Sequence, residues 1–268
     1  MSRRRLLASL PALLLAACGS PAPKAKTVSG TERVVEERGE WWLPPDAGTG
    51  RLPTVVLVHG GYWGPSYDRH LEDAVAADLS GRGYLCWNID YAAADQPWPT
   101  TLRDAAAAYD ALATGRFADR VDPARLSIVG HSAGGHLALW LASRKPPFAR
   151  TGPAPVTVVA QAPVAALAAG QKLGLGGGAI DQLLGGSPRE VPERYAQADP
   201  VALLPSGVRT VLLHSETDAL VPVSQSETYL AAAEAAGDDC TLERVPGDHF
   251  AHLDPKSEAC ARMRAALA

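Results

Sequence analysis

The feature that most constrains the fold is a regular alternation of short apolar runs with longer alanine-rich stretches, which begins near residue 33. Short runs of β-branched and apolar residues are typical of buried strands, whereas longer alanine-rich stretches are typical of helices. Chains that alternate the two build a mainly parallel sheet covered by helices on both faces. The sequence therefore predicts an α/β fold.

The alternation places the expected elements along a single domain, residues 32–268. Strands are expected at 34–43 (a strand or hairpin), 54–58, 84–89, 126–129, 156–161, 209–214 and 241–245. Helices are expected at 71–79, 101–113, 134–143, 223–236 and 255–267. Residues 165–206 interrupt the rhythm with many glycines and prolines, which favours an insertion or lid over the sheet rather than a second domain.

The N-terminus has the composition of a targeting segment. Three arginines at positions 3–5 precede an apolar stretch, residues 6–17, that is too short to span a membrane as a helix. The stretch ends in Leu15-Ala16-Ala17-Cys18, which resembles the lipobox of bacterial lipoproteins. The resemblance implies that residues 1–17 are a signal peptide and that Cys18 is lipidated. An ordinary secretory leader cut near Ala17 is the alternative, and both interpretations predict export.

Residues 18–31 are rich in small residues, proline and lysine, a composition typical of a flexible tether. The expected product is a membrane-anchored lipoprotein on the extracytoplasmic side of a bacterial cell, held by the lipid at Cys18. Removal of the leader changes the formal net charge from −4 to about −7. An acidic body without a Lys/Arg run argues against nucleic acid as a partner.

The pentapeptide Gly130-His131-Ser132-Ala133-Gly134 lies between the apolar run 126–129 and the helical stretch 134–143. A serine at such a strand-to-helix turn has a strained backbone, and a side chain two residues before or after it would collide. Both glycines thus have a steric reason to be there. Ser132 is predicted to be a catalytic nucleophile.

Serine is a weak nucleophile, so it needs a general base that is itself oriented by an acid. Asp218 follows the apolar run 209–214 after a short turn, which places its carboxylate at the carboxyl edge of the sheet. Asp218 is the predicted acid, and Glu216 in the same turn is the competing candidate. The chain order serine, aspartate, histidine is the one this arrangement of strands and helices uses.

The predicted base is His249, which comes sooner after the run 241–245 than the competing His252. The spacing of these histidines beside Asp248 and Asp254 could also suggest a metal site. No third histidine lies nearby in the sequence, so neither a metal nor a cofactor is expected.

A tetrahedral intermediate needs N–H donors that are already in place. His59-Gly60-Gly61-Tyr62-Trp63 directly follows the run 54–58, and the expected donors are the backbone N–H groups of Gly61, Tyr62 and Ala133. His59 is interpreted as a hydrogen-bond partner that shapes this loop, and His131 as a packing residue.

Three cysteines remain after Cys18. Cys86 lies in an apolar run and is expected to be a buried strand thiol. Cys240 and Cys260 flank the segment that contains His249, and export makes a disulfide between them possible. Spacing alone leaves that pairing open.

Together these motifs resemble the α/β-hydrolase superfamily, in particular its esterase and lipase branch with an HGG-type oxyanion loop, and within it proteins similar to kynurenine formamidase. The residues that carry the resemblance are His59 to Trp63, Gly130 to Leu137, Asp218 with Val221-Pro222, and His249-Phe250. The resemblance implies hydrolysis of a small-molecule ester or aryl formamide, with Tyr62 and Trp63 near the acyl or aryl pocket.

We expect a serine hydrolase that cleaves small carboxylic esters through an acyl-enzyme. The second candidate is an arylformamidase. Tyr62 stands where many related lipases have a third glycine, which disfavours long acyl chains. A catalytically inactive binding or scaffold protein is the alternative of a different class, and a peptidase is disfavoured because the chain has no room for a propeller or large cap.

Overall fold

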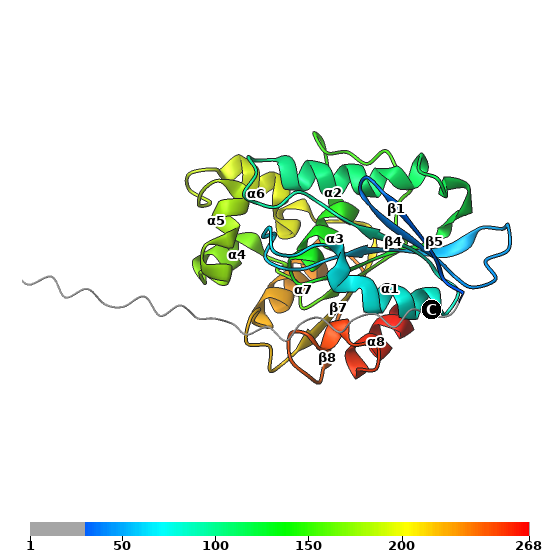
Figure 1. Cartoon of the computed structure of the whole chain (residues 1–268). Helices are drawn as coiled ribbons and strands as arrows, with labels where there is room; N and C mark the ends of the chain where they lie inside the picture. Colours follow the sequence, from blue (N-terminus) through cyan, green and yellow to red (C-terminus); the bar gives the residue numbers. More distant parts are fainter. Residues whose placement is uncertain (1–29, 268) are drawn as a thin grey trace, which may run out of the picture.

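A computed structural model describes residues 30–267 of the protein. The predicted signal peptide, the lipidation residue Cys18 and all but the last two residues of the predicted tether lie outside the described residues. The described part forms one sheet with helices packed on its two faces (Figure 1).

The sheet has eight strands in the order β1-β2-β4-β3-β5-β6-β7-β8. The first two strands form an antiparallel hairpin, β2 is also antiparallel to β4, and all the remaining neighbours are parallel. The strands are β1 (Glu32–Glu36), β2 (Gly39–Leu43), β3 (Leu52–Val58), β4 (Leu85–Ile89), β5 (Val121–His131), β6 (Thr157–Gln161), β7 (Arg209–Ser215) and β8 (Cys240–Val245). The predicted mainly parallel sheet is confirmed, with the N-terminal hairpin as its antiparallel edge.

Helices α2 (Thr100–Asp110) and α3 (Ala133–Ser143) cover one face of the sheet, while α1 (Asp73–Ser80) and α8 (Glu258–Leu267) cover the other (Figure 1). The buried side chains form two clusters accordingly, and helix α7 (Ser224–Ala236) contributes Tyr229 and Ala233 to the larger one, with α2 and α3. The sheet is apolar on both faces because both are covered. No helix within residues 30–267 is long and apolar enough to cross a membrane.

Residues 165–206 form a group of short helices at the carboxyl edge of the parallel strands. They are α4 (Leu167–Lys172), η4 (Leu175–Gly177), α5 (Ala179–Leu184), α6 (Pro192–Ala198) and η5 (Pro200–Leu203). Ile180, Leu183, Leu184 and Tyr195 belong to the larger apolar cluster. The glycine run 174–178 turns the chain between α4 and α5 through left-handed conformations, which glycine adopts at low cost.

Strand β5 is longer than the four residues expected, because its first residues are not apolar. Val121 pairs with Leu52 ahead of a register shift in β3, and residues 123–125 of β5 are exposed. Apolar periodicity therefore marks only the buried half of this strand.

The possible disulfide between Cys240 and Cys260 is absent from the structure, in which both residues and Cys86 are free thiols. Cys240 packs against the larger apolar cluster, whereas Cys260 belongs to the smaller cluster under α8. The sheet separates the two clusters, so the thiols lie on opposite faces. The positions of Cys240 and Cys260 on either side of His249 in the sequence could not reveal this separation, because it depends on the face of the sheet that each side chain occupies.

Glu72 ends the short helix η1 (Arg69–Glu72), is 1% exposed, and has no hydrogen-bond partner for either carboxyl oxygen within the described residues. Burial, with a smaller effect of the Asp73 charge, raises its pKa to about 8. The folded state therefore holds the Glu72 proton more tightly than the unfolded chain does. The free energy of unfolding is therefore unaffected by ionisation of Glu72 at low pH, where the carboxyl is protonated in both states. It falls as the pH rises towards 8, because the unfolded chain releases this proton first.

We predict that Glu72→Gln raises the free energy of unfolding by on the order of 1–3 kcal/mol at pH 7–8 and changes it little at pH 4. At pH 4 the carboxyl is mostly protonated in both states, so glutamine and glutamic acid are nearly equivalent. Urea unfolding at the two pH values measures the difference. Glu32→Gln, at an exposed residue of β1, is the control, and an equal effect at both pH values would contradict the prediction.

Candidate active site

Ser132 occupies a sharp turn between β5 and α3, with φ 58° and ψ −119°. The turn is possible because its two glycines lack side chains. A Cβ at Gly130 would lie 2.2 Å from the carbonyl oxygen of Gly134, and one at Gly134 would lie 2.0 Å from the carbonyl oxygen of Val58. The Ser132 N–H donates to Gln161 O at 2.8 Å, which ties the turn to the end of β6.

The structure brings Asp218 and His249 together at the carboxyl edge of the sheet. His249 Nδ1 donates to Asp218 Oδ2 at 2.6 Å, and the N–H groups of Leu220 and Val221 donate to Asp218 Oδ1, each at 2.8 Å. Burial would raise the pKa of Asp218, but the hydrogen bond and charge of His249, with those two N–H groups, outweigh it and hold the pKa below its usual value. Asp218 is thus an ionised partner for the imidazole.

The two competing residues lie in different surroundings. Glu216 points its carboxylate at Arg244, 3.3 Å away, and its side chain is 66% exposed. His252 is fully buried, and neither ring nitrogen has a hydrogen-bond partner within the described residues. Burial and the neighbouring His249 lower the pKa of His252 to about 3. Neither residue contacts Asp218 as His249 does.

Two further histidines hold the loops that carry the acid and the base. His131 Nε2 donates to the carbonyl oxygen of His249 at 2.9 Å, and the two rings are 4.6 Å apart. His214 Nε2 donates to Val221 O at 2.9 Å, and its Nδ1 accepts from Ser226 Oγ at 2.8 Å. Burial lowers the pKa of both histidines, so both are neutral donors.

Sequence reasoning treated His131 as a packing residue and missed His214. The available signal was position, because His131 is the last residue and His214 the penultimate residue of an apolar strand that leads into the site. A histidine at the end of a buried strand has few options except to donate to a neighbouring loop.

The loop after β3 packs directly on the nucleophile turn. A Cβ at Gly60 would lie 3.0 Å from the Cβ of Ser132. Gly61, Tyr62 and Trp63 all have positive φ, of 108°, 49° and 55°. For the two non-glycine residues this strain costs on the order of 1–3 kcal/mol each.

Within residues 30–267 the N–H groups of Gly61, Tyr62 and Ala133 donate to no protein acceptor. Three free donors beside a serine are what an oxyanion requires. His59 Nδ1 donates to Gly60 O at 2.8 Å, as expected for a residue that shapes this loop.

The two aromatic residues of the loop differ in surroundings. Trp63 is fully buried, with its ring edge-to-face against His136 at 5.2 Å, so it does not form the wall of an open pocket as expected. The physical reason is packing, because the Trp63 side chain belongs to the larger apolar cluster. Tyr62 remains partly exposed, and its hydroxyl donates to Leu220 O at 2.8 Å.

The arrangement can perform acyl transfer. His249 donates through Nδ1 to Asp218, which leaves Nε2 as the acceptor for a serine proton. Among the described residues no hydrogen bond joins Ser132 Oγ to His249, and such bonds are often long before substrate binds. The base and acid are paired, and the nucleophile turn is held against the same loop through His131.

We predict that Asp218→Asn lowers kcat for ester hydrolysis by about 10³- to 10⁴-fold, because asparagine can stabilise the wrong imidazole tautomer and does not stabilise the imidazolium. Glu216→Gln makes the same chemical change two residues away and should alter kcat by less than about twofold. Steady-state rates of both purified variants check this. Equal losses in the two variants, or a larger loss in Glu216→Gln, would exclude Asp218 as the acid.

The chain is similar in sequence and in fold to several known proteins. Esterase LipQ of Mycobacterium tuberculosis is 29% identical over 235 residues, which are 78% of this chain and 53% of LipQ. An uncharacterized protein of the same organism is 27% identical over 246 residues, 88% of this chain and 78% of the relative.

Among solved structures, Esterase B from Lactobacillus rhamnosis has a TM-score of 0.75 at 20% identity, covering 91% of this chain and 88% of that one. A truncated carbohydrate esterase from gut microbiota has a TM-score of 0.73 at 20% identity, covering 85% and 88%. The predicted α/β-hydrolase fold is therefore confirmed. Residues 42–232, most of the chain, match the BD-FAE family model, and the chain belongs to this family of the α/β-hydrolase superfamily.

Proposed function

We propose that the protein is an exported serine hydrolase that cleaves small carboxylic esters, with Ser132 as nucleophile, His249 as base and Asp218 as acid. The observation that carries the proposal is the 2.6 Å hydrogen bond from His249 Nδ1 to a buried aspartate, beside a strained serine turn. LipQ and Esterase B, which are similar to this chain, are named as esterases, and this supports the ester bond as the target.

The mechanism follows from the positions of the donors. His249 Nε2 removes the Ser132 hydroxyl proton as the oxygen attacks the ester carbonyl, and Asp218 stabilises the imidazolium. The N–H groups of Gly61, Tyr62 and Ala133 stabilise the oxyanion. Collapse breaks the ester C–O bond, and the alcohol leaves with the proton from His249. Water, deprotonated by His249, then attacks the acyl-enzyme, the acyl C–O bond to Ser132 breaks, and His249 returns the proton to the serine oxygen as the acid is released.

Tyr62 favours short acyl groups. Its hydroxyl donates to Leu220 O in the acid loop, and a Cβ at Gly176 would lie 2.6 Å from its ring. The side chain therefore spans from the oxyanion loop to the acid loop and to residues 165–206. Such a bridge narrows the approach to the N–H donors, so long chains lose contact or must displace the ring.

Two alternatives to a carboxylic-ester hydrolase remain to be distinguished by experiment. An aryl formamide uses the same serine chemistry with an amine leaving group, and the sequence from His59 to Trp63 is what suggests it. An inactive scaffold protein would keep the pocket without turnover.

We predict that a fluorophosphonate probe labels the wild type and not Ser132→Ala, and that Ser132→Ala lowers ester turnover by at least about 10³-fold. In a panel of p-nitrophenyl esters, kcat/KM should be highest for acetate to butyrate and should exceed that for N-formylkynurenine. A formylkynurenine rate above every ester would favour the formamidase. An unlabelled, inactive wild type beside a labelled control esterase would support the scaffold.

We further propose that Cys18 carries the lipid that anchors the protein outside the cytoplasm. Leu15-Ala16-Ala17-Cys18 after an arginine-led apolar stretch supports this, and residues 18–31 supply the spacer between lipid and domain. Lipidation with a diacylglyceryl group gives two chains, enough for stable attachment.

We predict that the full-length protein, expressed in a bacterium with lipoprotein-processing enzymes, partitions with membranes and incorporates labelled palmitate. Cys18→Ser should remove the label and release most of the protein from the membrane fraction, because the anchor is covalent. Cys86→Ser, at a buried strand residue, is the control. Unchanged labelling of Cys18→Ser would refute the anchor.

A further inference from the structure

The oxyanion loop, residues 59–64, is strained and must be held by its surroundings. Gly61, Tyr62 and Trp63 all have positive φ. Within the loop, Gly64 N donates to Gly61 O at 2.9 Å, and His59 Nδ1 donates to Gly60 O at 2.8 Å. A loop in this conformation keeps its N–H groups aimed at the reacting carbonyl only if other segments bind its backbone.

The segment 90–94, which follows β4, binds this loop at both ends. The Tyr91 hydroxyl donates to His59 O at 2.8 Å, and the Tyr91 and His59 rings stack at 4.2 Å with 6° between their planes. Three residues later, Ala94 N donates to Trp63 O at 2.7 Å. One short segment therefore sets the positions of the first residue of the loop and of the last aromatic residue.

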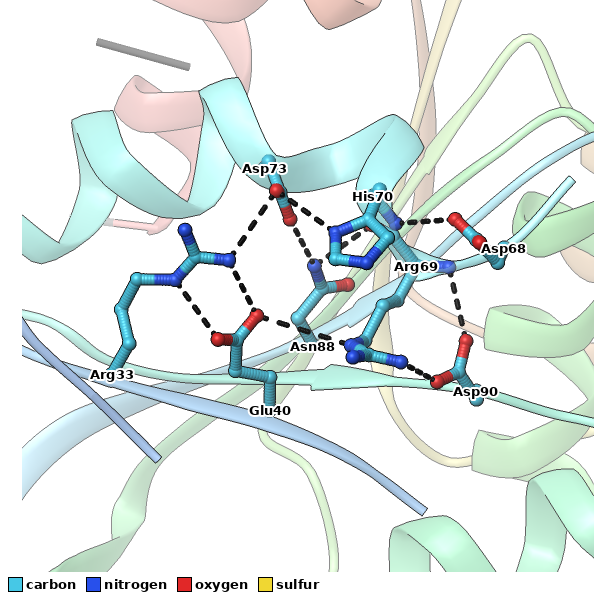
Figure 2. A network of polar contacts seen from close by, with 8 residues as sticks. All are labelled: Arg33, Glu40, Asp68, Arg69, His70, Asp73, Asn88 and Asp90. Atoms are coloured by element: carbon cyan, nitrogen blue, oxygen red, sulfur yellow. Dashed lines mark hydrogen bonds and ion pairs between the residues drawn. The ribbon is translucent and has the colours of Figure 1, made fainter. Parts of the chain in front are cut away.

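Asp90 anchors the start of this segment (Figure 2). Its side chain accepts from the Arg69 backbone N–H at 3.0 Å and forms an ion pair with the Arg69 guanidinium. The Asp90 N–H donates to Arg38 O at 2.9 Å. Arg69 is in turn held by Asn88, whose Nδ2 donates to Arg69 O at 2.9 Å. Asp90 is thus bound on its backbone and on its side chain.

The same network extends to the sheet edge, where Arg33 donates to both oxygens of Glu40 at 2.9 and 2.8 Å (Figure 2). Glu40, His70 and Asp73 place three potential ligand atoms within 4.8 Å of one another. The guanidinium of Arg33 binds Glu40 and lies 3.5 Å from Asp73, and Arg69 lies 3.9 Å from Glu40. Two arginines already balance these carboxylates, which favours a structural ion-pair network over a metal site.

We propose that Tyr91 is a positioning residue for the oxyanion loop. The Arg69–Asp90 ion pair fixes the start of the segment that carries Tyr91 and so keeps its hydroxyl within hydrogen-bonding distance of His59 O. The inference rests on the proposed serine-hydrolase function and adds residues outside the triad and the oxyanion donors. Two chemical features support it. Burial raises the pKa of Tyr91, so its hydroxyl stays a donor, and burial lowers the pKa of His59, so no charge develops beneath the oxyanion donors.

The test is Tyr91→Phe, with Tyr109→Phe as a matched control. Tyr109 is fully buried and Tyr91 partly buried, and the Tyr109 hydroxyl also donates to a backbone carbonyl, Pro153 O, at 2.8 Å, but at the far end of α2. Ester hydrolysis gives kcat and KM, and a short alkylboronic acid, whose serine adduct mimics the tetrahedral intermediate, gives an inhibition constant. Thermal unfolding of each variant reports on stability.

We expect Tyr91→Phe to lower kcat by about tenfold with KM changed by less than about twofold, because the hydroxyl acts on the transition state. Boronate inhibition should weaken by a similar factor. Tyr109→Phe should leave both values within about twofold of wild type even if its melting temperature falls equally.

Asp90→Asn tests the same inference without altering the tyrosine, and it should weaken boronate inhibition in the same direction. Unchanged boronate inhibition in both Tyr91→Phe and Asp90→Asn, or equal losses of kcat in Tyr91→Phe and Tyr109→Phe, would overturn the proposal. Failure of the proposed function is a separate result, since it would appear as absent turnover and absent probe labelling in the wild type.

Discussion

The close approach of Gly134 to the carbonyl oxygen of Val58 is the constraint on which the rest of the site depends. A Cβ at Gly134 would lie 2.0 Å from that oxygen, so only glycine allows the first turn of α3 to pack against the end of β3. This contact brings the turn that carries Ser132 against the loop that carries the N–H groups of Gly61 and Tyr62. Because β3 and β5 are parallel neighbours, both loops leave the sheet at the same edge. The proposed nucleophile and the proposed oxyanion donors are therefore adjacent as a result of strand order.

Buried histidines connect this contact to Asp218 and His249, the proposed acid and base. His131 follows Gly130 in the nucleophile turn and donates to the backbone of His249, while His214, the penultimate residue of β7, donates to the loop after Asp218. Each is uncharged because burial lowers its pKa, so each acts as a donor without adding charge beside the His249 ring. The pair of Asp218 and His249 is thus held through main-chain atoms of both loops. This explains how two residues 31 positions apart keep a 2.6 Å hydrogen bond on exposed connections.

Much of the site could be predicted because its residues follow apolar runs. Ser132, Asp218 and the loop from His59 to Trp63 each begin where a strand ends, and the carboxyl ends of parallel strands share one edge. Asp218 was preferred to Glu216 for its expected place at the carboxyl edge of the sheet, and His249 to His252 because it comes sooner after its strand. Trp63 was misjudged because its burial depends on packing against residues far away in sequence, such as His136. Tyr91, which holds the loop in our proposal, was not considered, because its partner His59 is 32 residues away in sequence.

The sequence by itself determined the fold class, the strand-to-helix turn around Ser132, and the order of serine, aspartate and histidine. These are local properties, encoded by the spacing of apolar residues and by glycines at positions where any side chain would collide with the backbone. Tertiary structure alone decided which side of the sheet each group occupies. It separated Cys240 from Cys260, buried Trp63 and His252, and joined Arg69 to Asp90. The physical reason is that hydrogen bonds and burial depend on distances across the sheet, which are set by strand order and register rather than by spacing along the chain.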